Sequence, residues 1–307
     1  MIELDNVVKV YEGKRIIDGV SMTIDHGAFW ALVGPSGAGK STTLKMINRI
    51  IPFTEGAIRI DGEDIMTIPA EVLRRRIGYA IQSIGLFPHW TIAENIATVP
   101  RLLKWPEARI KDRVMELLAL LRLDAATYAG KYPAQLSGGQ QQRVGVARAL
   151  AADPDLLLMD EPFGALDPIT RESLQAEMIR IHQTTGKTIV FVTHDMQEAV
   201  RLSTGIAVMK DGKLVQSAPV RDILERPVSD FIRDFVGRSR LELAMLGVKR
   251  VADRVRAGES ASGDALDMDS SLSDALYAML AHKVDRLPVV DTAGRPAGAI
   301  LLGDILG

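Results

Sequence analysis

A glycine-rich segment constrains the fold of this chain more than any other feature. Residues 34–41 read Gly-Pro-Ser-Gly-Ala-Gly-Lys-Ser, which fits the spacing G-x-x-x-x-G-K-[ST]. An apolar run at 31–33 precedes the segment, and residues 40–50 follow it with apolar side chains at helical spacing. A strand, a glycine-rich loop and a helix in this order predict an α/β domain that binds phosphate at the loop.

Each residue type in this loop has a chemical reason. Glycines let backbone amides close around phosphate oxygens, and the N-terminus of the next helix adds positive partial charge. Lys40 can reach the β and γ phosphates, and Ser41 offers a hydroxyl to Mg²⁺. We therefore predict a nucleotide site rather than an incidental glycine-rich connection. Its residues are Gly34, Pro35, Ser36, Gly37, Ala38, Gly39, Lys40, Ser41 and Thr42.

An acidic pair, Asp160 and Glu161, follows the apolar run 156–159. Successive side chains of a strand point to opposite sides, so the two carboxylates can do different work. Asp160 can hold Mg²⁺, while Glu161 can polarise the water that attacks the γ phosphate. Surface charge is the alternative for such a pair. Its position at the end of an apolar strand, downstream of a phosphate loop, favours catalysis.

Residues 136–140, Leu-Ser-Gly-Gly-Gln, form a second phosphate-binding candidate. They precede a predicted helix whose N-terminus would present Ser137 and free backbone amides to an anion. Together with the loop at 34–41 and the acidic pair, in this order, they resemble the ATPase subunit of ATP-binding cassette (ABC) transporters. The resemblance covers roughly residues 1–236 and implies a P-loop NTPase core with an N-terminal antiparallel β region. It also implies a helical insert at about 86–150, ATP and Mg²⁺ as cofactors, and ATP hydrolysis.

The resemblance extends to four single residues. It implies that Tyr11 stacks on adenine, that Gln82 meets Mg²⁺ or the attacking water, and that His194 contacts the γ phosphate. Asp167 would lie in a loop that reaches the other subunit, and capping of the helix that follows it is the alternative. A strand-end tyrosine, a surface glutamine and a structural histidine are the alternatives for the other three.

The family pairs two ATPase subunits head to tail. The resemblance therefore implies that ATP on Lys40 of one subunit is completed by Ser137, Gly138, Gly139 and Gln140 of the other. Hydrolysis would require this homodimer. The resemblance further implies integral membrane permease subunits as partners, an indirect link to a substrate-binding protein, and a peripheral position on the cytoplasmic face of the inner (plasma) membrane.

The C-terminal part of the chain has a different character. Residues 237–265 are expected as a connecting helix and linker, and residues 266–307 as the main part of a small α/β domain. Its segments together resemble one CBS motif that begins near residue 248. The segments that carry this resemblance are 271–280, 286–291, 294–295 and 303–306.

Two further segments suggest which cassette protein this is. Residues 82–92, which contain Leu-Phe-Pro-His, and residues 234–238 resemble ATPases that import glycine betaine, choline or carnitine. The CBS motif is typical of these osmoprotectant ATPases. An ATPase for polar amino acids or another small solute is the alternative, and a nucleotide-sensing regulatory protein is the alternative from a different class.

Composition excludes some classes of binding partner for this chain. Lys and Arg number 37 against 39 Asp and Glu, which argues against a dedicated nucleic-acid binder. No apolar run approaches the ~20 residues that span a bilayer, and the acidic start is unlike a signal peptide. We therefore expect a soluble cytoplasmic chain. With no cysteine, disulfides and thiolate metal sites are excluded.

Three surface hypotheses complete the sequence analysis. The first concerns Leu86, Phe87 and Trp90, an apolar cluster just after Gln82. We expect it to border a groove that receives a helix of the membrane subunit, and core packing of the helical insert is the alternative.

The second hypothesis concerns four cations, Lys249, Arg250, Arg254 and Arg256, which lie within eight residues. They could contact anionic lipid, although a solvated helix face is the simpler interpretation.

The third hypothesis concerns an apolar helical stripe of Leu272, Leu276, Met279 and Leu280. It could pair the C-terminal units of two subunits, or it could form the core of one unit.

Overall fold

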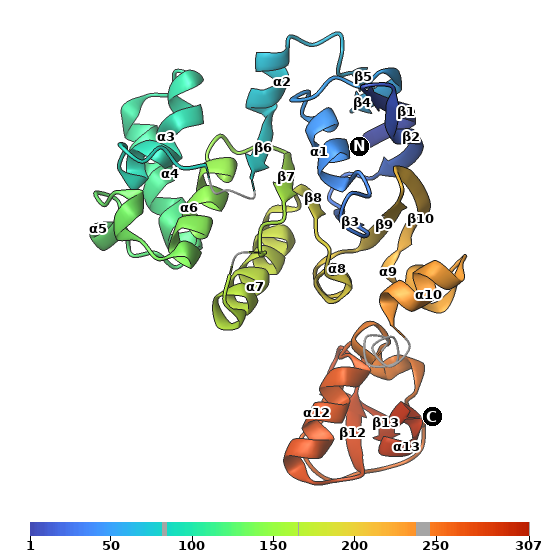
Figure 1. The fold of residues 1–307 in the computed structure, drawn as a ribbon. Helices are drawn as coiled ribbons and strands as arrows, with labels where there is room; N and C mark the ends of the chain where they lie inside the picture. The colour runs from blue at the N-terminus through green and yellow to red at the C-terminus, as the bar shows by residue number, and fades with distance from the viewer. Residues whose placement is uncertain (82–84, 165, 238–245, 307) are drawn as a thin grey trace. The chain divides into compact units, whose positions relative to one another are not determined.

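The computed structural model describes residues 1–81, 85–164, 166–237 and 246–306. The chain divides into two compact units, Met1–Pro219 and Val220–Gly307, which are described separately here. Figure 1 shows the elements of both. The domain boundary expected after residue 236 rests on motif similarity and stays a prediction.

The N-terminal antiparallel region is confirmed as a sheet of order β2-β1-β4-β5. The mostly apolar stretch 21–33 is not one strand, because a turn at 25–27 divides it. Ala28 N donates to Asp25 O across this turn, and Gly27 takes a positive φ of 66°. The strands are β1 (Ile2–Tyr11), β2 (Lys14–Ile24), β4 (Glu55–Ile60) and β5 (Glu63–Asp64).

The central sheet has the order β10-β9-β3-β8-β7-β6. All neighbours are parallel except β10, which pairs antiparallel with β9. The strand expected at 156–159 is confirmed as β7, and both β7 and β8 are fully buried. The strands are β3 (Phe29–Val33), β6 (Ile77–Ala80), β7 (Leu156–Asp160), β8 (Thr188–Val192), β9 (Gly205–Lys210) and β10 (Lys213–Pro219).

Helices cover both faces of the central sheet. Helix α1 (Lys40–Ile47) lies between the two sheets, where Leu44 packs in one core with Ile58 of β4 and Leu158 of β7. On the other face, the ring of Phe191 on β8 contacts that of Phe29 at a centroid distance of 5.4 Å. The alternation of side chains along each strand thus builds two apolar layers. Helices α7 (Pro168–Thr185) and α8 (Met196–Leu202) follow β7 and β8.

The region expected as a helical insert is helical. Within it, α4 begins after Pro106 and buries Ile110, Val114, Leu117 and Leu118 on one face. It packs with α3 and α6. The helices are α2 (Ala70–Arg76), α3 (Ile92–Leu102), α4 (Glu107–Leu120), α5 (Ala125–Tyr128) and α6 (Gly138–Leu150), with a 3₁₀ turn at Pro133–Gln135.

A buried asparagine holds the loop before α3. Asn95 Nδ2 donates to the carbonyls of Phe87 at 3.1 Å, Trp90 at 3.1 Å and Thr91 at 2.9 Å, and its Oδ1 accepts from Phe87 N at 2.7 Å. The side chain therefore replaces the backbone pairing that a loop lacks. Sequence analysis missed this residue, because an asparagine inside a helix carries no motif.

The second unit contains a sheet of order β11-β12-β13. Leu272 and Met279 of α12 are buried against it, and Leu276 packs beside them, so most of the predicted apolar stripe is core of its own unit. Leu280 instead is 65% exposed. The elements are α9 (Val220–Glu225), α10 (Asp230–Val236), a 3₁₀ turn (Val251–Asp253), β11 (Leu266–Asp267), α12 (Leu272–His282), β12 (Arg286–Val290), β13 (Pro296–Leu301) and α13 (Leu302–Leu306).

Two of the four cations in the proposed lipid patch have partners within this unit. Arg256 forms a bidentate pair with Asp304, at 2.9 and 2.6 Å, and Arg250 donates to Asp269 O at 2.6 Å. The charge of Arg256 is thus already compensated. Lipid contact stays a prediction that now rests mainly on Lys249 and Arg254.

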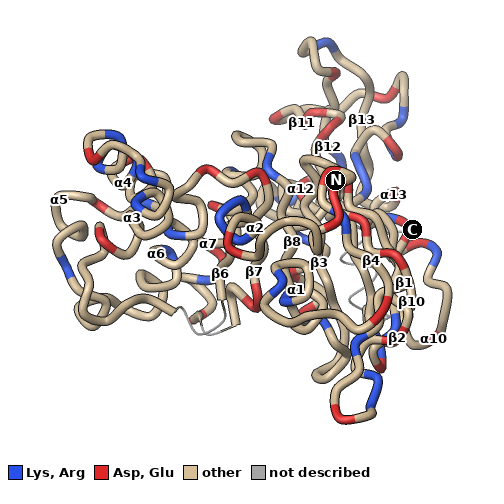
Figure 2. The backbone as a smooth tube through the Cα atoms, turned by 90° about the horizontal axis from the view of Figure 1, so that it is seen from above, with Lys and Arg blue, Asp and Glu red and all other residues tan. Residues whose placement is uncertain are grey.

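Charges of both signs are interspersed along the chain (Figure 2). Within the part of the chain that the structure describes, no helix has both the length and the apolar character needed to cross a bilayer.

The hydrogen bonds of Asn95 lead to a stability prediction. Asn95→Ala should lower the free energy of unfolding by about 2–4 kcal/mol, because buried backbone groups of the loop lose their partners. Urea denaturation of the full-length chain would measure this. Asn48→Ala is the matched control, since Asn48 is also buried but its Oδ1 has no hydrogen-bond partner. Equal losses in the two variants would contradict the role given to Asn95.

Candidate nucleotide-binding site

The carboxyl ends of β3, β7 and β8 meet at one edge of the central sheet, as parallel strands require. A cavity of about 610 Å³ lies at this edge, and small-molecule sites span about 300–1,000 Å³. It brings the predicted loop together with Glu161 and His194. The lining residues are Ile16, Ser36, Gly37, Ala38, Gly39, Lys40, Ser41, Thr42, Glu161 and His194.

Close backbone packing requires glycine at the start of the loop. Gly34 has φ of 150°, and a Cβ there would lie 2.1 Å from the carbonyl oxygen of Met209. The loop folds around Lys40, whose Nζ donates to Gly34 O at 2.8 Å and to Pro35 O at 2.9 Å. Burial lowers the pKa of Lys40, and the nearby carboxylate of Glu161 opposes this shift. A phosphate would be a stronger acceptor for this cation than two neutral carbonyls.

The two predicted metal ligands that the structure describes lie side by side. Ser41 Oγ, at the start of α1, donates to Asp160 Oδ1 at 2.7 Å. Among the described residues no three carboxylate or imidazole side chains cluster to hold a metal by themselves. A hydroxyl beside one carboxylate fits Mg²⁺, which takes few protein oxygens and completes its shell with phosphate and water. Gln82, the third predicted ligand, lies outside the described residues.

Glu161 and His194 face each other across the cavity. His194 Nδ1 lies 3.7 Å from Glu161 Oε2. Glu161 takes a left-handed backbone conformation with φ of 46°, which is uncommon for a residue other than glycine and marks many functional positions. Its amide donates to Val192 O of β8 at 3.1 Å. The strand ends therefore fix both side chains next to the phosphate loop.

Several other residues predicted to contact the nucleotide do not line the cavity. Tyr11, at the end of β1, is 64% exposed and is not part of the lining, although Ile16 of the same hairpin is. Ser137, Gly138, Gly139 and Gln140 begin α6 in the helical region and do not line it either. Their adenine and phosphate contacts stay predictions.

The predicted second anion site has a well-formed helix start. Ser137 is the N-cap of α6, and its Oγ accepts from Gln140 N at 3.3 Å. The Gln140 side chain accepts in turn from Ser137 N at 3.0 Å. This capping box orders the end of the helix at which the amides of Gly138 and Gly139 lie.

Asp167 caps α7, which was the alternative open at that position. Its Oδ1 accepts from Thr170 N at 3.1 Å, and hydrogen bonding to Thr170 lowers the pKa of the Asp167 carboxyl. The side chain of Thr170 lies against Gly139, where an added Cβ would come within 2.3 Å of Thr170 Cγ2. The start of α6 and the start of α7 are therefore packed together. No sequence motif predicted this contact.

Fold and site together define a P-loop nucleotide-binding protein. The ABC transporter family model matches residues 17–164, and the CBS domain model matches residues 265–307. The chain belongs to the ABC transporter family.

Curated relatives extend over most of the chain. The glycine betaine uptake system ATP-binding protein YehX of Escherichia coli K12 is 53% identical over 306 residues, covering 100% of this chain and 99% of that protein. The glycine betaine/carnitine/choline transport ATP-binding protein OpuCA of Bacillus subtilis 168 is 49% identical, covering 95% of this chain and 76% of that protein.

A solved structure shares the fold of the nucleotide-binding region. It is the dimeric, post-hydrolysis state of the ATP-binding cassette MJ0796 bound to ADP and Pi. It matches with a TM-score of 0.65 and 35% identity, covering 72% of this chain and 99% of that one.

The contact between Gly139 and Thr170 generates a prediction. Gly139→Ala should lower the free energy of unfolding by about 1–3 kcal/mol, because overpacking forces the two helix starts apart. Adding Thr170→Ser removes the obstructing methyl group and should restore most of the loss. Gly138→Ala is the control, since a Cβ there meets nothing within 4 Å. Denaturant unfolding of these chains measures the effect, and a loss that Thr170→Ser leaves unchanged would refute the assigned contact.

Proposed function

We propose that this chain is the ATP-hydrolysing subunit of an importer for a quaternary ammonium osmoprotectant such as glycine betaine, choline or carnitine. One observation carries the proposal. The phosphate loop, Glu161 and His194 line a single cavity in a chain that is 53% identical, end to end, to a glycine betaine uptake ATP-binding protein. The transported class comes from the relatives, because the cavity itself fits a nucleotide.

Nucleotide binding starts at the loop. Amides of residues 36–41 and the Lys40 ammonium hold the β and γ phosphates of ATP, and Tyr11 stacks on the base. Ser41, Asp160 and Gln82 would hold Mg²⁺, which supplies charge neutralisation of the phosphate oxygens when bound. The 2.7 Å contact between Ser41 and Asp160 supports this assignment.

Glu161 and His194 act at the γ phosphate. Glu161 accepts a hydrogen bond from the attacking water, whose oxygen forms a new bond to phosphorus as the bond to the β-γ bridging oxygen breaks. His194 donates to the γ phosphate and stabilises the charge that spreads over its oxygens. Their 3.7 Å separation supports joint action on one phosphate.

A second copy of the chain completes the site. Ser137, Gly138, Gly139 and Gln140 lie at the start of α6 outside the cavity, which suits contact with the ATP of a partner subunit in a head-to-tail dimer. Beside Asp167, Ile169 is 82% exposed, so its apolar side chain is available for contact with a partner subunit. The dimeric MJ0796 cassette is a solved precedent for pairing.

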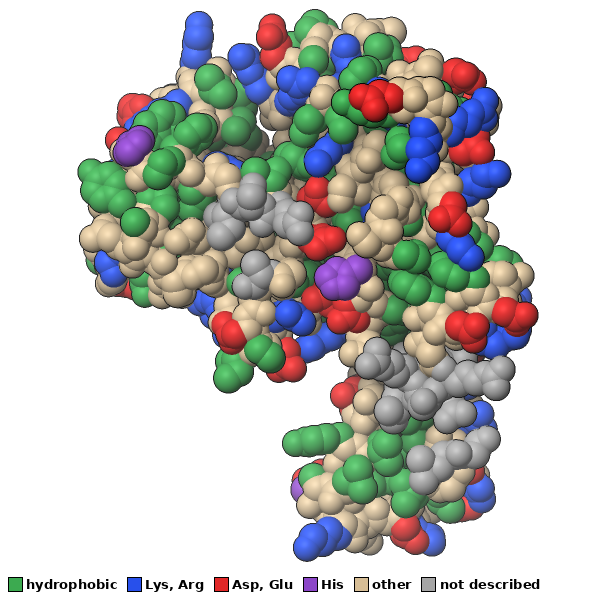
Figure 3. Space-filling model, viewed as in Figure 1, with side chains coloured by type: hydrophobic (Ala, Val, Ile, Leu, Met, Phe, Trp, Pro, Cys, Tyr) green, Lys and Arg blue, Asp and Glu red, His purple; other side chains and the backbone are tan. Residues whose placement is uncertain are grey.

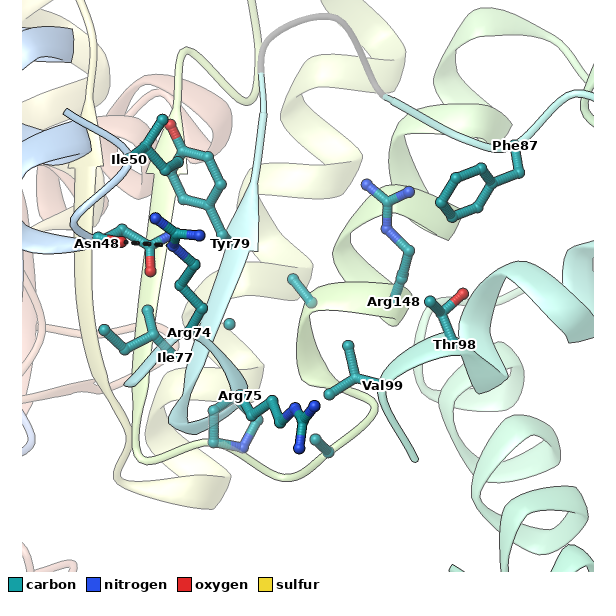
Figure 4. A pocket seen from close by; sticks show the side chains of 14 residues that line it. Asn48, Ile50, Arg74, Arg75, Ile77, Tyr79, Phe87, Thr98, Val99 and Arg148 are labelled. Atoms are coloured by element: carbon teal, nitrogen blue, oxygen red, sulfur yellow. Dashed lines mark hydrogen bonds between the residues drawn. The ribbon is translucent and has the colours of Figure 1, made fainter. Parts of the chain in front are cut away.

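A groove beside β6 suits the permease. It measures 510 Å³ and lies between β6 and the helices α3 and α6. Figure 4 shows Arg74 and Tyr79 on one side, with Arg148 and Phe87 on the other. Arginines around an apolar floor suit a helix that carries both carboxylates and apolar side chains.

The apolar cluster after Gln82 belongs to this surface rather than to the core of the insert. Phe87 and Trp90 are exposed, with ring centroids 4.5 Å apart, and Phe87 lines the groove. Hydrophobic side chains gather over the helical region in the space-filling view (Figure 3). We place the chain at the cytoplasmic face of the membrane, where permease subunits and ATP meet, with the binding protein as an indirect partner.

The catalytic assignment predicts a clear separation of binding and turnover. Glu161→Gln should lower the ATPase rate by at least about 100-fold, because it removes the water-orienting carboxylate and keeps the side-chain size. ATP affinity should change little. Lys40→Ala is the contrasting variant and should weaken ATP binding itself. Phosphate release and an ATP titration measure the two effects, and a Glu161→Gln chain that turns over at the original rate would disprove the assignment.

The groove predicts a specific neighbour. The chain contains no cysteine, so Phe87→Cys introduces a unique attachment site. A short thiol cross-linker on it should join the chain to a permease subunit in the assembled transporter. Met66→Cys, at an exposed residue of the N-terminal region, is the control. Products from Phe87→Cys that contain only the ATPase chain would remove the docking role of the groove.

A further inference from the structure

A network of buried polar side chains lies behind the loop that carries His194. Thr193 Oγ1 donates to Glu198 Oε2 of α8 at 2.6 Å and accepts from Asp195 N at 3.0 Å. The residues on both sides of His194 are therefore connected to one carboxylate. The ring of His194 is itself exposed, so its backbone neighbours determine where it lies.

The second oxygen of Glu198 faces α7. Gln175 Nε2 donates to Glu198 Oε1 at 3.3 Å, and Arg171 Nε lies 3.8 Å from the same oxygen. Arg171 Nε is buried and makes no hydrogen bond among the described residues. Its Nη2 donates to Leu166 O at 3.0 Å, directly before Asp167. A chain of contacts thus runs from the Asp167 segment to the segment of His194.

Burial of the Glu198 carboxylate costs free energy, which its hydrogen bonds must offset. Glu198 is 8% exposed, and burial raises the pKa of its carboxyl while the Thr193 hydroxyl opposes that shift. The partners that the described residues supply to Glu198 are Thr193, Gln175 and Arg171, and Glu198 is not part of the nucleotide cavity. The stabilisation that it provides is therefore directed at the loop of His194.

We propose that Glu198 is a positioning residue for ATP hydrolysis, which holds His194 through Thr193 and links it through Arg171 to the segment before Asp167. The proposal rests on the proposed ATPase function. Glu198 fixes the path of the backbone on either side of the histidine, so that the imidazole meets the γ phosphate at a set position. Small displacements of a catalytic group are enough to lower the rate strongly.

A mutant cycle tests the proposal on the full-length chain. Glu198→Gln removes the anionic partner of Arg171 with little change of shape. It should lower the single-turnover hydrolysis rate about tenfold with KM for ATP changed less than twofold. In a His194→Ala chain, the same substitution should change the residual rate less than twofold, because the residue through which it acts is gone.

Thr193 provides a second arm that does not depend on replacing a charge. Thr193→Val keeps the shape and removes the hydroxyl, so it should reproduce the loss seen with Glu198→Gln. Thr193→Ser keeps the hydroxyl and should retain the rate within about twofold. If Glu198→Gln fails to fold, the hydrolysis rates of the two Thr193 variants test the positioning role by themselves.

Glu177→Gln is the matched control. Glu177 of α7 is also a buried carboxylate that pairs with arginines, Arg122 at 3.3 Å and Arg180, but among the described residues no hydrogen bond or ion pair joins it to the network of Glu198. Its substitution should change stability and leave the hydrolysis rate within about twofold.

The outcomes separate the two proposals. If the unsubstituted protein does not hydrolyse ATP, the proposed function and this inference are both wrong. An active original chain in which Glu198→Gln lowers the rate equally with and without His194, or in which Glu177→Gln lowers it as much, overturns this inference alone. A loss confined to chains that carry His194, reproduced by Thr193→Val and absent in Thr193→Ser, supports it.

Discussion

The parallel pairing of β3, β7 and β8 is the constraint on which the rest of the structure depends. It sends three chain segments, far apart in sequence, out of the sheet at the same edge. Each segment then contributes one part of the cavity lining: the phosphate loop, Glu161 or His194. A strand reversed in this sheet would remove one of these groups from the cavity altogether. The buried faces of the strands are therefore as necessary for catalysis as the polar residues at their ends.

The sequence was sufficient to predict the structure where a motif is flanked by segments with the hydrophobic periodicity of a strand or a helix. The loop at 34–41 lies between a strand and a helix as expected, and the apolar runs before Glu161 and His194 are buried strands. The antiparallel N-terminal region, the helical insert and the small C-terminal unit were also anticipated. These features depend on local spacing, which one sequence carries in full.

Contacts that depend on the approach of distant segments could not be predicted. The contact of Thr170 with Gly139 and those of Gln175 and Arg171 with Glu198 join segments that are far apart in the chain. The bonds of Asn95 to the nearby backbone were also missed, because an asparagine within a helix is an ordinary residue. The apolar stripe of α12 shows the same limit. Its period was recognised correctly, yet only the folded unit shows that Met279 is core and Leu280 is exposed.

Asn95 of α3 binds backbone groups of the segment that leads into this helix, and the aromatic rings of that segment lie at the surface. Because the asparagine bonds to the carbonyls of Phe87 and Trp90, these hydrogen bonds do not depend on which side chains stand at the two positions. An exchange of the two rings would therefore change the chemistry of this surface and leave the backbone hydrogen bonds beneath it in place.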